Sequence, residues 1–238
     1  MGTNILIIGA SGDIGSAIAV RLGNEGYKLI LHYNRNRENI NKIKGKLDNE
    51  CVLGEIKADL SKDEEVKRLL TELVFPVDGI IFASGNAYYG LFQDTTEEKM
   101  DEMLTIHVKS PWMITKHLLN SMIQRKYGKI LFITSIWGDV GASNEVVYST
   151  VKGAQNSFVK ALAKETGPSG ISVNAISPGF IDTKMNEHFN EDEKAMIVSE
   201  IPLNRVGMPN DIANAVSFLM GDQSSYIQGE IIRINGGW

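Results

Sequence analysis

Three polar side chains in the second half of the sequence have the types and spacing needed to move a proton to or from a carbonyl oxygen. Ser135 ends an apolar run that begins at Gly128, and Tyr148 precedes Lys152 by one helical turn. A tyrosine hydroxyl can act as a general acid or base, and a neighbouring ammonium stabilises its phenolate. A serine at the end of a strand can donate to a developing oxyanion. The chemistry predicted is reduction of a ketone.

Short apolar runs alternate with helical patterns along the chain, which predicts repeated βαβ units and strands covered by helices on both faces. The strands expected are Asn4–Ile8, Lys28–Tyr33, Val52–Ala58, Gly79–Ala83, Lys129–Thr134, Ile171–Ser177 and Glu230–Ile234. The best-defined helices are Ile14–Leu22, Asp63–Val74, a long one from about Thr96 that is kinked or broken at Pro111, Ser149–Glu165 and Asp211–Met220. The predicted fold is a Rossmann-like α/β three-layer αβα sandwich on a seven-stranded, mostly parallel, doubly wound sheet.

The first predicted strand runs into a glycine-rich turn and then a helix. Glycines at these spacings let the backbone turn sharply and approach a pyrophosphate, whose charge the free amides at the helix start favour. This predicts one dinucleotide-binding catalytic domain over residues 1–238. The contacts expected from the turn are Gly9, Ser11, Gly12, Asp13, Ile14 and Gly15.

The segment after the second strand indicates which dinucleotide binds. It reads Asn34-Arg35-Asn36-Arg37, without the acidic residue that would accept hydrogen bonds from an adenosine ribose and repel a 2′-phosphate. NADP(H) is therefore favoured over NAD(H), although two surface arginines can also be simply solvated. Asp59-Leu60 and Gly85-Asn86 follow later strands, at the edge where a doubly wound sheet binds its ligand. No metal is expected.

Composition excludes several other classes of protein. The chain has 238 residues and a net charge of −5 with scattered Lys and Arg, which does not suggest a nucleic-acid surface. Its single Cys51 lies in an apolar run, where a small buried hydrophobe is expected rather than a reactive thiol. No apolar stretch approaches 18 residues, so a cytoplasmic protein outside the membrane is expected.

In these motifs the chain resembles the single-domain short-chain dehydrogenases/reductases over essentially its full length. The matching motifs are the glycine loop, Asp59, Ala83-Ser84-Gly85 in the place of Asn-Ala-Gly, Ser135, Tyr148 with Lys152, and Pro178-Gly179 followed by Ile181 and Thr183. Their joint order and spacing is very specific. The resemblance implies that the cofactor is also contacted by Ala83, Ser84, Gly85, Pro178, Gly179, Ile181 and Thr183.

The resemblance implies a role for each catalytic residue. Tyr148 would be the general acid/base, and Ser135 would orient the substrate oxygen. Lys152 would hold the nicotinamide ribose and lower the Tyr148 pKa, so both residues of the pair also belong to the cofactor site. Ile181 and Thr183 would lie near the carboxamide.

Besides Ala83-Ser84-Gly85, three positions depart from the family pattern. Asp13 stands where the family usually has Gly, and Gly12 stands where many NADP enzymes carry a basic residue. His107 replaces the Asn that supports a water chain to the Lys in the family. Because His titrates near neutrality it could serve as a proton shuttle, or it could equally be a buried, hydrogen-bonded core residue.

Two substrates are suggested by resemblance within the family. One branch, the 3-oxoacyl-[acyl-carrier-protein] reductases, docks an acidic carrier protein on two basic patches, of which Arg125 and Lys126 match one while Ser169 stands in the other. The Trp137 region also resembles a divergent relative that reduces the 5-aminopentanone modification on elongation factor P. Asp139 or Glu145 could meet the amine of that substrate, although exposed acids are usually solvated.

Aromatic and apolar residues are expected to wall the pocket. They are Asn86 to Tyr89, Phe92, Trp137 and the segment from Met185 to about Ile201, which is predicted to be a lid or an ordinary surface helix. A different class of function, a non-catalytic NADP-binding sensor, would need none of the three catalytic residues. The family resemblance also implies a homotetramer, formed by the long helix and the Tyr148 helix.

Overall fold

A wholly parallel sheet forms the centre of the computed structural model, which describes residues 3–238. Seven strands occur in the order β3-β2-β1-β4-β5-β6-β7. They are β1 (Asn4–Ile8), β2 (Lys28–Tyr33), β3 (Val52–Lys57), β4 (Gly79–Phe82), β5 (Gly128–Ile133), β6 (Ile171–Pro178) and β7 (Ile231–Ile234). The predicted fold class is confirmed, and each strand boundary lies within one residue of its prediction.

The sheet is a layer between two apolar cores. Ile5 and Ile7 of β1 point into one cluster, while Leu6 and Ile8 point into the other, because successive side chains of a strand alternate between faces. All four are 0% exposed. This explains why the strands read as continuous apolar runs rather than alternating ones.

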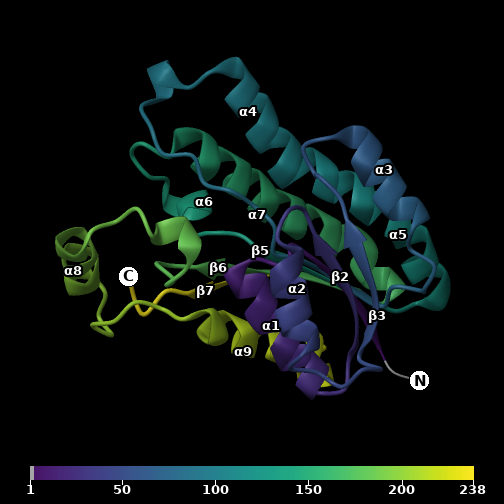
Figure 1. Cartoon of the computed structure of the whole chain (residues 1–238). Helices are drawn as coiled ribbons and strands as arrows, with labels where there is room; N and C mark the ends of the chain where they lie inside the picture. The colour runs from purple at the N-terminus through teal and green to yellow at the C-terminus, as the bar shows by residue number, and fades with distance from the viewer. Residues whose placement is uncertain (1–2) are drawn as a thin grey trace.

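Helices cover both faces (Figure 1). Helices α1, α2 and α9 pack on one face, and α3, α5 and α7 pack on the other. The helices are α1 (Asp13–Asn24), α2 (Arg37–Lys44), α3 (Asp63–Thr71), α4 (Glu97–Leu104), α5 (Ser110–Arg125), α6 (Trp137–Val140), α7 (Val146–Thr166), α8 (Glu191–Glu200) and α9 (Pro209–Met220). Helix α8 stands apart from both layers, near the carboxyl end of the chain (Figure 1).

Besides the short helix α6, which was not predicted, two helices differ from the sequence-based expectation. Helix α2 was not predicted; Asn36 begins it by accepting a hydrogen bond from the Asn39 amide at 3.0 Å. The long helix is interrupted just before Pro111 rather than at it, and Pro111 itself lies in the first turn of α5. The interruption is a π-helical turn, Thr105–Lys109, which joins α4 to α5 and carries His107.

The strand order reverses direction at β1, whose neighbours are β2 on one side and β4 on the other. In a doubly wound sheet the loops on either side of such a reversal separate and leave a crevice at the carboxyl ends of the strands. The loops after β1, β4, β5 and β6 all reach this edge. Among residues 3–238, no helix combines the length and apolar character needed to cross a membrane.

Candidate active site

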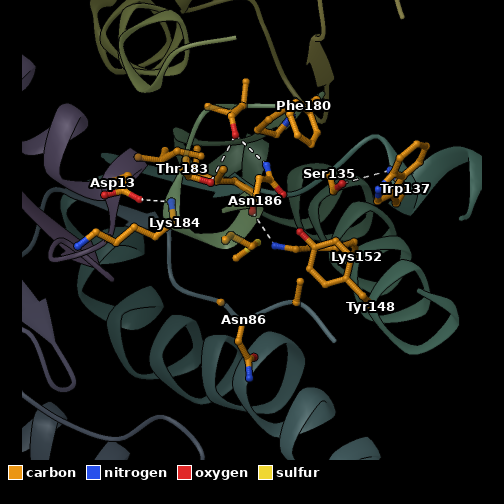
Figure 2. A pocket seen from close by; sticks show the side chains of 18 of the residues that line it. Asp13, Asn86, Ser135, Trp137, Tyr148, Lys152, Phe180, Thr183, Lys184 and Asn186 are labelled. Carbon is orange, nitrogen blue, oxygen red and sulfur yellow. Dashed lines mark hydrogen bonds between the residues drawn. The ribbon is translucent and has the colours of Figure 1, made fainter. Parts of the chain in front are cut away.

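A cavity of about 660 Å³ opens at the carboxyl edge of the sheet. Most of the predicted site residues line it: Ser11, Gly12, Asp13, Ile14, Ala83, Ser84, Gly85, His107, Ser135, Tyr148, Lys152, Pro178, Gly179, Ile181 and Thr183. In Figure 2 the catalytic group of Ser135, Tyr148 and Lys152 faces Asp13 and Lys184 across the view. The volume lies within the range of ordinary small-molecule sites.

Six predicted cofactor residues lie outside the cavity lining: Gly9, Gly15, Asn34, Arg35, Asp59 and Leu60. Gly9 and Gly15 shape the loop from behind, since a Cβ on Gly15 would lie 2.2 Å from the Gly9 oxygen. The Asp59 carboxylate accepts from the Ser61 amide and hydroxyl at 3.0 and 2.8 Å. Arg35 is exposed beyond the end of β2.

Tyr148, Lys152 and Ser135 converge because β5 ends and α7 begins at the cavity. Ser135 follows β5 directly, and its hydroxyl oxygen accepts from the Trp137 amide at 3.2 Å, which leaves its proton available. Tyr148 lies in the first turn of α7, where the helix dipole favours a phenolate. The Lys152 ammonium lies 5.5 Å from the centre of the Tyr148 ring and donates to the Ile133 carbonyl at 3.0 Å.

Burial dominates the ionisation of this group. Desolvation raises the pKa of Tyr148 well above its ordinary value, the charge of Glu145 raises it further, and a hydrogen bond with Ser135 opposes both. Desolvation also lowers the pKa of Lys152 to about 7. The expected lowering of the Tyr148 pKa by Lys152 is therefore not found in this structure, because burial outweighs the attraction of an ammonium that is itself only partly protonated near pH 7.

The glycine loop has the features of a pyrophosphate cradle. Gly12 precedes α1 and offers no side-chain cap, so the amides of Asp13 and Ile14 remain available at the cavity. Nearby, the Ser84 hydroxyl and the Asn86 side-chain oxygen are buried and have no hydrogen-bond partner within residues 3–238. Available donors and unpartnered polar atoms around a cavity of this size fit a bound dinucleotide.

Asp13, one of the departures from the family pattern, has a specific partner. Its carboxylate accepts a hydrogen bond from the Lys184 amide at 2.8 Å, across 171 residues of sequence (Figure 2). The contact ties the start of α1 to the segment that follows β6. Asp13 therefore joins two walls of the cavity, whereas a glycine there could not.

Comparisons with known proteins agree with these motifs. The family model described as enoyl-(acyl carrier protein) reductase matches residues 9–238. The 3-oxoacyl-[acyl-carrier-protein] reductase FabG of Rickettsia felis is 35% identical over 236 residues, covering 99% of this chain and 96% of that protein. The chain belongs to the short-chain dehydrogenase/reductase family. The family resemblance predicted from the sequence is thereby confirmed.

Two further relatives of this reductase family span the whole chain. A Bacillus subtilis (strain 168) protein named uncharacterized oxidoreductase YmfI is 46% identical over 240 residues, covering 100% of this chain and 99% of that protein. A Beutenbergia cavernae structure, described as an NAD(P)-dependent gluconate 5-dehydrogenase with NADP bound at low occupancy, superposes with a TM-score of 0.94. It is 25% identical and covers 100% of this chain and 96% of that one. This chain is an oxidoreductase of the same family.

His107 stands where this family usually has Asn, and its hydrogen bonds define its state. Its Nε2 lies 2.9 Å from the Asn86 carbonyl, which can only accept, so Nε2 carries the proton and Nδ1 is a buried acceptor without a partner among the described residues. Burial, assisted by the charge of Lys152, lowers the pKa of His107 to about 3. The ring is therefore neutral near pH 7, which favours a buried hydrogen-bonded role over proton shuttling.

We expect His107→Asn, which restores the family residue, to reduce turnover less than about tenfold. A neutral His107 does not titrate between pH 5 and 8, so the acidic limb of the pH–rate profile should not move in this variant. Steady-state rates measured across that range check this. Loss of an ionisation near pH 6 to 7 in His107→Asn would instead establish His107 as a proton shuttle.

The structure adds wall residues that the sequence did not single out: Asn36, Phe180, Lys184 and Trp238. The Trp238 ring meets that of Trp137 edge to face at 5.1 Å, and its indole N–H donates to Glu200 at the end of α8. Two expected wall residues, Tyr88 and Phe92, do not line the cavity, and Phe92 is 53% exposed. The residue types at these positions do not show, from the sequence alone, whether a side chain lines the cavity or lies on the outer surface.

The segment from Met185 to Ile201 does cover the cavity. Met185, His188, Phe189 and Ile197 line it, and an Asn190–Glu193 capping box begins α8. Its closure on a ligand remains a prediction.

Proposed function

We propose that the protein reduces a ketone to an alcohol with NADPH. The observation that carries the proposal is the convergence of Ser135, Tyr148 and Lys152 in the same cavity as the glycine loop. A non-catalytic sensor would need the loop but not the catalytic group.

Bound NADPH would supply the hydride that adds to the carbonyl carbon. The Tyr148 hydroxyl then gives its proton to the new alkoxide, and the high pKa that burial imposes on Tyr148 keeps this proton in place until it is needed. Ser135 donates to the same oxygen as its charge develops. Lys152 returns a proton toward Tyr148, a task suited to an amine whose pKa lies near 7.

NADPH is proposed over NADH because no acidic side chain stands at the end of β2. Arg37 is held by the Glu55 carboxylate, with its Nε donating at 3.0 Å, so Arg35 is the cation left to meet a 2′-phosphate. Asn36 lines the cavity beside it. The NADP-bound relative supports the same choice.

Two ketone substrates remain in the proposal. The first is a 3-oxoacyl thioester, which sequence similarity to the 3-oxoacyl-[acyl-carrier-protein] reductases favours. A ketone that ends in an amine, such as the 5-aminopentanone group on elongation factor P, is the second. Glu145 favours the second, because it lines the cavity beside Tyr148 and Trp137 and burial raises its pKa. A carboxylate desolvated in this way gains from a cationic partner.

The other charged positions also bear on this choice. Asp139 is paired with Arg233 on β7, so Glu145 is the acid best placed for an amine. Arg125, which would receive a carrier protein, is held by the Val77 carbonyl at 2.6 Å and by Asp78 at 3.5 Å. These pairings weaken the basic patch on which a carrier protein would dock.

The two substrates are separated by Glu145→Gln, which keeps the shape of the side chain and removes its charge. For an amine-ended ketone the variant should raise KM about tenfold, whereas for a neutral acetoacetyl thioester KM should stay within about twofold. NADPH oxidation with each substrate gives both values. Equal changes for the two ketones would remove the argument for an amine, and no turnover of either by the wild-type protein would refute the proposed reaction.

The homotetramer also remains a proposal. Trp112 and Ile123 of α5 are exposed apolar side chains on a helix that the family resemblance places at a subunit interface. Sedimentation at micromolar concentration measures the assembly.

A further inference from the structure

His32, near the carboxyl end of β2, is a buried titratable residue that the proposed reaction does not use. It is 2% exposed. Its Nδ1 accepts from the Gly9 amide at 3.1 Å, and its Nε2 lies 3.0 Å from the Ala58 carbonyl. One ring thus links the ends of three adjacent strands, β1, β2 and β3, at the edge of the sheet where the cavity opens.

The partners of His32 fix which nitrogen carries its proton. A carbonyl oxygen only accepts, so the Ala58 contact requires a proton on Nε2, and the lone pair of Nδ1 is then directed at the Gly9 N–H. Burial lowers the pKa of His32 to about 4, so the ring is neutral near pH 7. Both nitrogens are satisfied, and neither can exchange its role without breaking a hydrogen bond.

Gly9 is the first residue of the glycine loop, and the later residues of the loop contact it. Its φ is +86°, and a Cβ at this position would lie 2.6 Å from the Ser84 backbone, so only glycine fits. Its carbonyl accepts from the Gly12 amide at 3.1 Å and lies against Gly15. The Gly9 amide and carbonyl belong to successive peptide units, so holding the amide positions Gly9 and, through its carbonyl, Gly12 and the start of α1, whose amides face the cavity.

The second contact reaches another predicted cofactor segment. Ala58 immediately precedes Asp59 and Leu60, and its own amide donates to the Tyr33 carbonyl at 3.0 Å. The main chain of His32 adds a further tie, since its carbonyl accepts from the Ala10 amide at 2.9 Å. The side chain and the backbone of His32 thus connect the glycine loop to the segment that begins at Ala58.

We propose that His32 is a positioning residue for the dinucleotide, holding the Gly9 peptide through Nδ1 so that the amides at the start of α1 face the pyrophosphate. The proposal rests on the proposed NADPH binding. It assigns the Gly9 hydrogen bond to cofactor affinity and the Ala58 hydrogen bond to stability of the sheet edge.

Two variants separate these contacts. In His32→Asn the amide oxygen can take the place of Nδ1 and accept from Gly9, while the link to Ala58 is lost. In His32→Gln the amide nitrogen can take the place of Nε2 and donate to Ala58, while the acceptor for Gly9 is lost. Fluorescence titration then gives the Kd for NADPH, and thermal unfolding gives the Tm.

We expect His32→Gln to raise the Kd for NADPH about tenfold and His32→Asn to leave it within about twofold, although both lower the Tm. Equal Kd values in the two variants, whether unchanged or equally weakened, would overturn the proposal, because a merely structural residue does not distinguish them. If His32→Gln does not fold, a folded His32→Asn with a tenfold higher Kd overturns it equally.

A measurement without cofactor keeps this inference separate from the proposed function. Hydrogen–deuterium exchange of the peptide that contains Gly9 to Gly15 should be faster in His32→Gln than in His32→Asn or the wild type. Equal exchange in all three contradicts the Gly9 contact. Failure of the wild-type protein to bind NADPH would refute the proposed cofactor, and with it the assigned role of His32.

Discussion

Tyr148→Phe is expected to lower turnover of any ketone by about 10²- to 10⁴-fold, because it removes the hydroxyl that protonates the alkoxide. Phenylalanine retains the aromatic ring, whose centre lies 5.8 Å from that of the His107 ring in an edge-to-face contact. Because Tyr148 is only 8% exposed and this packing is kept, the site should keep its shape. The measurement is single-turnover oxidation of NADPH with saturating ketone. Removing only the hydroxyl tests proton donation rather than packing.

The control for this variant is cofactor affinity. Tyr148→Phe should bind NADPH within a few-fold of the wild type, since Asp13 of the glycine loop lies across the cavity from Tyr148 (Figure 2). Undiminished turnover in Tyr148→Phe would refute the assignment of the general acid. A variant that loses both cofactor and turnover would indicate a disturbed site instead.

Lys152→Met is expected to inactivate the protein and to stabilise it at the same time. Loss of the amine should lower turnover roughly 10- to 1000-fold, because the proton returned to Tyr148 and the positive charge near it both disappear. Burying a charge costs free energy, and Lys152 is 4% exposed. Replacing it by a side chain of similar length should therefore raise the free energy of unfolding by about 1–4 kcal/mol at pH 6. The Ile133 carbonyl loses its donor, which offsets about 1 kcal/mol of the gain.

The gain should depend on pH in one direction. The pKa of Lys152 falls from 10.5 in the unfolded chain to about 7 in the folded one, so between these values only the unfolded chain holds the proton. Wild-type stability therefore rises with pH across this window relative to the variant. The free-energy penalty of burying the Lys152 charge is complete below about pH 7 and vanishes above about pH 10.5.

Urea unfolding of both proteins at pH 6 and pH 9.5 measures this difference. The advantage of Lys152→Met should be larger at pH 6. An advantage that does not change with pH would show that Lys152 is not destabilised by burial in the folded protein. Lower stability of the variant at both values would contradict the prediction outright, since it would make the amine a net stabilising group.

The fold was predictable because its signals are local. Runs such as Ile5 to Ile8 are apolar on both faces, and only a strand covered on both sides has that requirement. The ends of these runs mark the ends of the strands, so the boundaries deviate by at most one residue. Helix α2 was missed because its own residues are mostly polar and only Ile40 and Ile43 are buried. The cap at Asn36 was a sequence signal that could have found it.

The catalytic group was predictable from spacing, whereas its electrostatics were not. That Tyr148 and Lys152 share a helix face follows from their separation of four residues. The direction of their pKa shifts depends on how completely the surrounding elements exclude water, and no local pattern encodes that. The same holds for Asp13, whose partner Lys184 lies 171 residues away. Trp238 likewise could not be predicted as a wall residue, because it lines the cavity only as a result of the path that the chain takes after β7.

The π-helical turn between α4 and α5 has a consequence for which changes this segment can tolerate. A π turn holds about one more residue than an α turn, so it absorbs an extra residue with little net rotation of the helices on either side. Deleting a single residue from Thr105–Lys109 would therefore restore α geometry and keep α4 and α5 in nearly the same relative orientation. The change would instead be local, because His107 would be displaced from its place against Tyr148. Among related reductases, we therefore expect a one-residue difference in length here to leave the flanking helices in place and to change which side chain faces Tyr148.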